Sequence, residues 1–267
     1  MSIFENFGSI VDTWLTIDET WNGSTPRFGH RSSLNRLVSE HVAVGNGEHL
    51  VNKLYDKLLC NWDQKPSNGQ QNWRHTQNLH LGENSKSLEV TLQRIFMRAN
   101  NDQNWANEVP VASGVAGTGP DSVDFVHVAD NEYSMIELKW PQPNSGENPL
   151  KAAIQVLRYG LAYVFSRVNA EKLQYEIENK PILKASQVHL RVLAPQHFYD
   201  PFNTGDSWLK KLESALNQGI ESLAKANDFS MSFAYEQFPA DFKWDLSDCS
   251  GDKQEQVVEA FQNRKCF

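Results

Sequence analysis

The chain has 267 residues, of which 40% are hydrophobic and 22% are charged, and this composition argues against wholesale disorder. The length fits one large domain or two small ones. The formal net charge of −8 argues against a protein that wraps nucleic acid by bulk charge, although it leaves room for a local basic groove.

Membrane and secretory signals are not found in the sequence. No apolar run approaches the roughly 18 residues that a membrane span requires, and the first five residues lack the basic and apolar regions of a signal peptide. The three cysteines, Cys60, Cys249 and Cys266, lie far apart and form no CxxC pair. This pattern is typical of reduced thiols rather than of a disulfide framework or a zinc finger. We therefore expect a cytoplasmic protein with no membrane contact.

The first third of the chain is rich in aromatic residues and predicts helices separated by irregular segments. A helical pattern begins at Ser33, and glycines at positions 45 and 47 interrupt it. A second helix is predicted over residues 50–58, and the polar stretch 64–80 predicts a long loop.

The chain after residue 84 is more regular and predicts alternating helices and strands. Several of its strands are apolar on both sides, which is typical of a sheet covered on both faces. We therefore predict an α/β core over residues 85–267, on which an N-terminal helical extension, residues 1–84, packs. The predicted elements are, in chain order, a helix over 88–96, strands over 109–112, 122–128 and 133–139, a helix over 149–167, a strand over 188–193, a helix over 208–223 and a strand over 231–235. The acidic tail after residue 236 shows no recognisable pattern.

The predicted hairpin of strands 122–128 and 133–139 carries the most informative residues. A two-residue turn at positions 130–131 would put Asp124 opposite Glu137. Lys139 shares their face, because side chains along a strand alternate with period two. Burying two carboxylates and an ammonium in an apolar sheet costs free energy unless these groups are paired or bind a metal. Oxygen ligands in this arrangement favour Mg²⁺.

The same hairpin resembles motifs two and three of the PD-(D/E)XK nuclease superfamily, which has the restriction-endonuclease-like fold. Glu137, Leu138 and Lys139 match the (D/E)XK element, and Asp124 matches the aspartate of the preceding strand. The resemblance implies that Asp124 and Glu137 bind Mg²⁺, for which Mn²⁺ can substitute, with the Leu138 carbonyl as a third ligand. It also implies that Lys139 assists the attacking water.

A literal Pro-Asp pair at Pro120 and Asp121 offers an alternative metal ligand. The hairpin register puts Asp121 on the opposite face from Glu137, so we prefer Asp124. A β-bulge between the two aspartates would reverse this preference.

Two further features strengthen the resemblance, which covers roughly residues 85–195. Gln155 and Tyr159 lie four residues apart on a predicted helix, hence on one face, and this QxxxY spacing is similar to that of the RecB-like branch. The resemblance implies that Gln155 lies near the metal and Tyr159 near DNA. Glu89, on the preceding helix, matches a glutamate that contacts the metal directly or through water. The order α-β-β-β-α-β also matches the core of the family.

Structural explanations compete with these functional ones. The charged hairpin residues are also consistent with a solvated cross-strand ion pair, and Gln155 and Tyr159 with a half-buried helix face. Glu89 lies in the first turn of a predicted helix, where a carboxylate stabilises the helix through the helix dipole without any functional role. Arg94, Arg98 and Arg158 are either phosphate contacts or ordinary surface arginines.

The sequence as a whole predicts a Mg²⁺-dependent nuclease that hydrolyses DNA, with RNA as a substrate that it does not exclude. The alternative is a catalytically silent nucleic-acid-binding or assembly module on the same fold. The presence of both carboxylates and the lysine favours an enzyme. Sequence specificity, endonuclease or exonuclease action, a role in restriction, repair or defence, and the existence of a homodimer are left open.

Overall fold

A mixed β-sheet forms the centre of the computed structural model, which describes residues 2–17, 42–81, 87–141, 146–203, 207–245 and 253–267. Within these residues six strands lie in the order β3-β4-β5-β6-β7-β8. β4 is antiparallel to both of its neighbours, β3 and β5. β5, β6 and β7 are parallel, and β8 is antiparallel to β7. The strands are β3 (Trp105–Pro110), β4 (Ser122–Ala129), β5 (Glu132–Leu138), β6 (Gln187–Ala194), β7 (Ser230–Gln237) and β8 (Lys265–Cys266).

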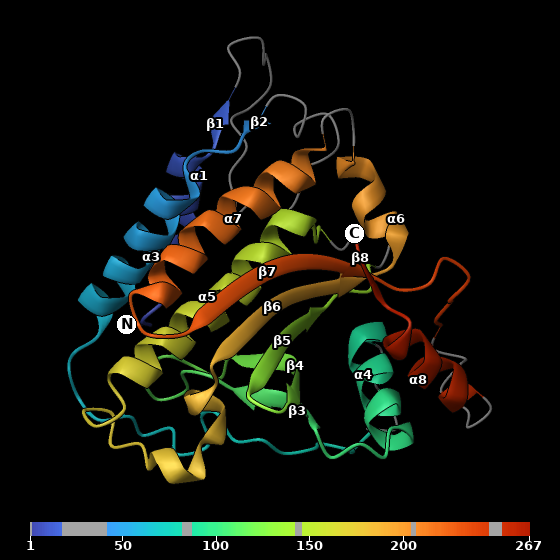
Figure 1. The fold of residues 1–267 in the computed structure, drawn as a ribbon, viewed down its shortest axis with the longest axis horizontal. Helices are drawn as coiled ribbons and strands as arrows, with labels where there is room; N and C mark the ends of the chain where they lie inside the picture. The colour runs from blue at the N-terminus through green and yellow to red at the C-terminus, as the bar shows by residue number, and fades with distance from the viewer. Residues whose placement is uncertain (1, 18–41, 82–86, 142–145, 204–206, 246–252) are drawn as a thin grey trace.

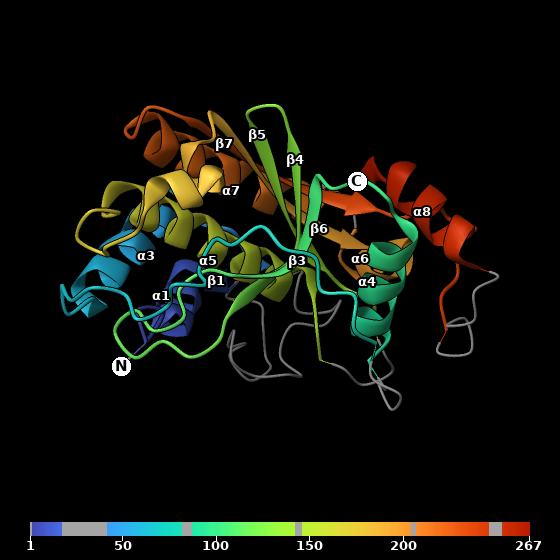
Figure 2. The same cartoon turned by 90° about the horizontal axis from the view of Figure 1, so that it is seen from below.

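Helices cover both faces of this sheet, and the predicted α/β architecture is confirmed at that level (Figures 1 and 2). One face carries α1 (Phe7–Trp14), α3 (Gly47–Asn61), α5 (Pro149–Val168) and α7 (Trp208–Lys225). The other face carries α4 (Leu88–Ala99) and α8 (Gln254–Gln262). Shorter elements are β1 (Thr16–Ile17), β2 (Val42–Ala43), α6 (Gln196–Tyr199) and the 3-10 helices Ile177–Asn179, Pro181–Lys184 and Asp200–Phe202.

The predicted core elements are present in the predicted order, with one clear displacement. The strand expected over 109–112 is β3, which runs from Trp105 to Pro110. The polar residues Asn107 and Glu108 interrupt the apolar pattern, so the sequence does not indicate that the strand begins at Trp105. Asn107 is nevertheless buried, because its side chain donates to the carbonyl of Asn78 and accepts from the same residue's amide, in the loop beside this edge strand.

Local capping explains where the main helices begin. Asn148 accepts a hydrogen bond from the Lys151 amide and Pro149 occupies the first position of α5, as predicted. Ser87 caps α4 in the same way. The helix predicted from Ser33, like Cys249, lies outside the described residues.

The N-terminal helix α3 packs on α7 and α5, which cover this face of the sheet, and α1 packs on α3. Their buried side chains belong to the same apolar cluster as those of α5 and α7. Gly47 is required at the crossing of α3 and α7, because a Cβ there would lie 1.6 Å from the Ala215 carbonyl oxygen. The division of the chain at residues 84 and 85 stays a prediction.

The acidic tail, for which the sequence predicted no element, forms α8, which completes the second helical layer, and β8, which pairs with β7 at the edge of the sheet. The ring of Phe261 on α8 stacks on Phe96 of α4, with the centroids 4.0 Å apart. Within the part of the chain that the structure describes, no helix has the length and hydrophobicity to span a bilayer.

Candidate active site

The hairpin of β4 and β5 has the predicted register. Phe125 pairs with Ile136 and Val126 with Met135, so opposed residue numbers sum to 261 as expected for a turn at 130–131. Asp130 takes a left-handed conformation in that turn, with φ of 53°. Asp124 precedes Phe125, the last paired residue of β4, so the register brings Asp124 next to the end of β5.

Asp124 is held at that position by backbone contacts. Its Oδ2 atom accepts a hydrogen bond of 2.8 Å from the Leu138 amide. Its own carbonyl accepts a hydrogen bond of 2.5 Å from Nε2 of Gln93 on α4. The carboxylate is therefore fixed between the ends of both hairpin strands, while it stays partly accessible.

Glu137 and Lys139 form a buried ion pair at the end of β5. Glu137 is 1% exposed and Lys139 is 6% exposed, and Lys139 Nζ lies 2.5 Å from Glu137 Oε1. The other carboxylate oxygen, Oε2, is buried and has no hydrogen-bond partner among the described residues. Because an orphaned buried acceptor is costly, this oxygen marks a place for a proton, a cation or the hydroxyl of Tyr159, which acts on the same carboxyl.

Glu89 brings a third carboxylate to this region from the first turn of α4. Its Oε1 atom accepts a hydrogen bond of 2.8 Å from the amide of Trp140, the residue that follows Lys139. The charge of Glu89 acts on both Asp124 and Lys139. Three carboxylates from three elements thus act on the charge of one ammonium group, and we call Glu89, Asp124, Glu137 and Lys139 the carboxylate cluster.

The carboxylate cluster has more negative than positive charge, and the pKa values reflect this. Burial raises the pKa of Asp124 to about 6, against the smaller opposing effects of Lys139 and the Leu138 amide. Burial, followed by the charge of Asp124, raises the pKa of Glu137 well above its ordinary value. Burial lowers the pKa of Lys139, but the carboxylates of Glu137, Asp124 and Glu89 together raise it above its usual range. Lys139 is therefore cationic at neutral pH.

The QxxxY pair lies beside the cluster on α5. Gln155 Nε2 donates a hydrogen bond of 3.0 Å to the Tyr159 hydroxyl, so the predicted shared face is confirmed. Tyr159 is 1% exposed, and its hydroxyl acts on Glu137 by lowering the pKa of that carboxyl. Burial, followed by the charge of Glu137, raises the pKa of Tyr159 itself, so the phenol stays protonated as a donor.

The alternative aspartate, Asp121, has a different environment. Its Oδ2 atom lies 2.5 Å from Nη2 of Arg158 on α5, whose guanidinium lies over the Phe4 ring at 4.4 Å. Arg94 is likewise paired, with Glu108 on β3. The structure brings Asp124 rather than Asp121 next to Glu137, and both arginines serve internal contacts.

Two contributors to the site were not identified from the sequence. Gln93, which binds the Asp124 carbonyl, follows Glu89 by four residues and shares its helix face, and this spacing was the available signal. The amide of Trp140 contributes through the backbone, for which the side chain gives no signal.

The donor set has the chemistry of a Mg²⁺ site, since Glu89, Asp124 and Glu137 offer only oxygen ligands. The described residues contain no group of three or more His, Cys, Asp or Glu side chains already arranged around one metal position. Lys139 Nζ instead contacts Glu137. Leu138 presents its amide to Asp124, and the role of its carbonyl as a ligand stays a prediction. The orphaned Oε2 of Glu137 is the feature that fits a cation best.

Comparisons with known proteins add no family assignment. No protein-family model matches the chain, and neither the curated proteins nor the solved structures contain a match. The chemistry of the carboxylate cluster and its neighbours is therefore the basis on which a function is proposed.

Proposed function

We propose that this chain is a Mg²⁺-dependent nuclease that hydrolyses phosphodiester bonds of DNA, in the manner of the PD-(D/E)XK enzymes that its hairpin resembles. Asp124, Glu137 and Glu89 would hold the metal, with the Leu138 carbonyl as the further ligand that the resemblance implies. A bound divalent cation would supply Lewis-acid stabilisation of the phosphoryl oxygens and make a bound water more acidic.

One observation carries this proposal: three carboxylates converge on a single lysine in a largely buried site. If all three are ionised, the cluster has an excess of two negative charges, and the raised pKa values of Asp124 and Glu137 express that cost. A structural ion pair needs only one carboxylate for one lysine. The two additional carboxylates are explained by a divalent cation, whose charge equals the excess.

The residues of the cluster have separate tasks in hydrolysis, in which a water oxygen bonds to phosphorus and the leaving ester oxygen takes a proton. Lys139, cationic and adjacent to Glu137, is placed to orient the water or to stabilise charge that develops on the phosphate. Tyr159 and Gln155 orient Glu137 from α5. The Trp140 amide orients Glu89.

The direct test is cleavage of linear, circular and single-stranded DNA in Mg²⁺, Mn²⁺ or EDTA. We expect metal-dependent cleavage that Lys139→Ala abolishes. Lys139→Ala leaves Glu137 buried without its partner, which can destabilise the fold. Lys139→Met is therefore the second variant, because it retains the packing of the aliphatic stem. The matched control is Lys184→Ala, which removes an exposed lysine that pairs with Glu178. Full activity of a folded Lys139 variant would refute the assignment.

One observation favours the second candidate, a module without catalysis. Lys139 neutralises Glu137 directly at 2.5 Å, so part of the cluster is already internally compensated. Such a module needs no Mg²⁺, and its melting temperature should not respond to the metal. A metal-induced rise in melting temperature that Asp124→Asn removes favours the nuclease, because only binding to the folded state stabilises it.

A further inference from the structure

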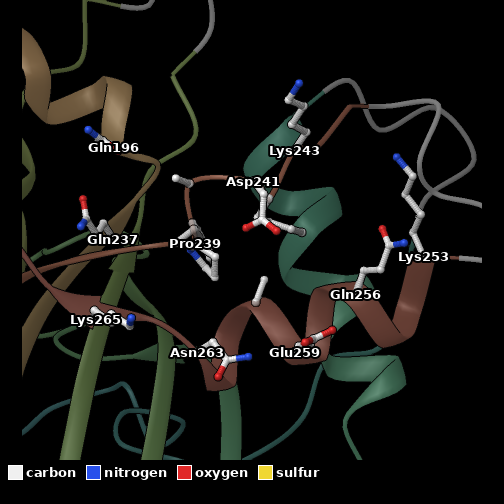
Figure 3. Close-up of a pocket in the computed structure, with 14 residues that line it drawn as sticks. Gln196, Gln237, Pro239, Asp241, Lys243, Lys253, Gln256, Glu259, Asn263 and Lys265 are labelled. Atoms are coloured by element: carbon white, nitrogen blue, oxygen red, sulfur yellow. The ribbon is translucent and has the colours of Figure 1, made fainter.

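A polar cleft of about 860 Å³ lies at the same edge of the sheet as the carboxylate cluster, and no residue of the cluster lines it. It is formed by the segment after β7, by α8 and by the first residue of α6 (Figure 3). Gln196 and Gln237 lie on one side of it, and Lys253 and Gln256 on the opposite side. This volume is in the range of pockets that hold small molecules or short chain segments.

The cleft and the cluster share one edge of the sheet. Leu138 pairs with Leu193, which pairs with Glu236, so the next residues, Lys139 and Gln237, lie level at the carboxyl ends of β5 and β7. They are separated by two strand spacings of about 4.8 Å, or about 10 Å between backbones. In open sheets with parallel strands, this edge is the usual place for ligands.

Aromatic contacts make the wall of the cleft continuous with the cluster. Phe238 and Phe242 line the cleft, and their ring centroids lie 5.7 and 5.6 Å from that of Trp140. Trp140 directly follows Lys139 and donates its amide to Glu89. The packed rings therefore connect the wall of the cleft to the residue that orients Glu89.

The lining of the cleft is suited to a polyanion with polar edges. Three lysines line it against two carboxylates, Asp241 and Glu259. Gln237 has a buried Oε1 atom without a hydrogen-bond partner among the described residues. Side-chain amides offer a donor and an acceptor together, which is the pattern that base edges present.

We propose that this cleft binds a single strand of DNA next to the cleavage site, with Lys243 and Lys265 at phosphates and Gln237 at a base edge. A concave cleft accepts a strand or a splayed base, whereas reading a duplex requires an element that protrudes into a groove. The position of the cleft relative to the scissile phosphate rests on the proposed nuclease function. At about 3.4 Å per stacked nucleotide, the separation of about 10 Å corresponds to roughly three nucleotides.

The test measures binding without cleavage. Fluorescein-labelled single-stranded 12-mers and the matched duplex are titrated in EDTA and followed by fluorescence anisotropy. The variant is Lys243→Ala with Lys265→Ala, since both side chains are exposed and line the cleft. The matched control is Lys53→Ala with Lys225→Ala, which removes two exposed lysines from α3 and α7 on the other face of the sheet.

We expect the cleft variant to raise the Kd for single strands at least about tenfold. We also expect the slope of log K against log salt to fall by roughly 1.4, since each phosphate contact on a single strand contributes about 0.7. The control pair should change neither quantity. Gln237→Leu, which keeps the side-chain volume, should weaken binding by about threefold or more.

Unchanged binding by the cleft variant, equal weakening by the control pair, tighter binding of the duplex, or binding of RNA alone would each overturn the inference. The two proposals fail separately. Strand binding that requires the cleft, in a protein that cleaves no substrate, supports the cleft and counts against the nuclease. Cleavage that depends on Lys139, in a protein whose cleft variant binds normally, supports the nuclease and counts against the cleft.

Discussion

Replacing Asp124 by asparagine should stabilise the metal-free protein at alkaline pH. The pKa of Asp124 is about 6 in the folded state against an ordinary value of 3.8, a difference of about two pH units. At about 1.4 kcal/mol per unit, the ionised carboxylate costs the folded state roughly 3 kcal/mol. The asparagine side chain carries no charge, and its oxygen can still accept the hydrogen bond from the Leu138 amide.

The sign of this effect depends on pH in a defined way. Because the folded-state pKa is raised, the folded state binds the extra proton between about pH 4 and pH 6, and the wild-type protein loses stability as pH rises through this window. Asp124→Asn should therefore add roughly 3 kcal/mol to the free energy of unfolding at about pH 8 and almost nothing at about pH 4. For a chain of this length, the gain corresponds to a rise in melting temperature of about 6 °C or more.

The assay is thermal and urea unfolding of both proteins in EDTA at pH 4, 6 and 8. Asp56→Asn, at an exposed position on α3 outside the carboxylate cluster, is the matched control. Mg²⁺ at about a thousandfold excess over Kd should reverse the order of stability at pH 8, since the wild type gains about 4.1 kcal/mol and the variant does not. A destabilised variant at pH 8, or an equal effect at pH 4 and pH 8, would contradict the electrostatic reasoning.

Three single contacts each support a further prediction. Tyr159→Phe should lower the cleavage rate about tenfold or more with a small change in melting temperature, because it removes the hydroxyl that acts on Glu137, and an unchanged rate would exclude that role. Phe261→Ala should cost about 3–5 kcal/mol in urea unfolding, because its buried ring stacks on α4, whereas a cost below about 1 kcal/mol would show that α8 contributes little to the core. Gly47→Ala should cost at least about 2 kcal/mol in the same measurement, since its Cβ would meet the Ala215 carbonyl, and a neutral substitution would be incompatible with the close helix crossing.

The parts of the fold that the sequence predicted well are governed by local rules. The hairpin register follows from turn geometry and the period of two along each strand, and the observed pairing of Phe125 with Ile136 agrees with it. The start of α5 follows from an asparagine cap and a proline at the first position. The contact between Gln155 and Tyr159 was likewise predictable, because it depends only on their spacing along one helix.

The parts that the sequence did not predict depend on tertiary contacts. The tail carries many charges, and the burial of Val257, Ala260 and Phe261 in the cluster beside α4 makes α8 part of the core. The strand β3 contains Asn107, whose burial is permitted by a partner in a distant loop. The Trp140 amide contacts Glu89 across 51 positions of sequence. None of these partners can be identified from a local pattern.

The tail and the candidate active site are physically connected through α4. Phe261 of α8 packs on Phe96 of α4, and the Trp244 indole donates to the Leu88 carbonyl at the start of the same helix. Glu89 follows Leu88 directly, so the segments after β7 fix both the position of the third carboxylate and the wall of the polar cleft. The C-terminal segment thus covers one face of the sheet and also places charged and polar groups around one edge of it. This arrangement is consistent with a binding surface at the edge of the sheet that holds the carboxylate cluster.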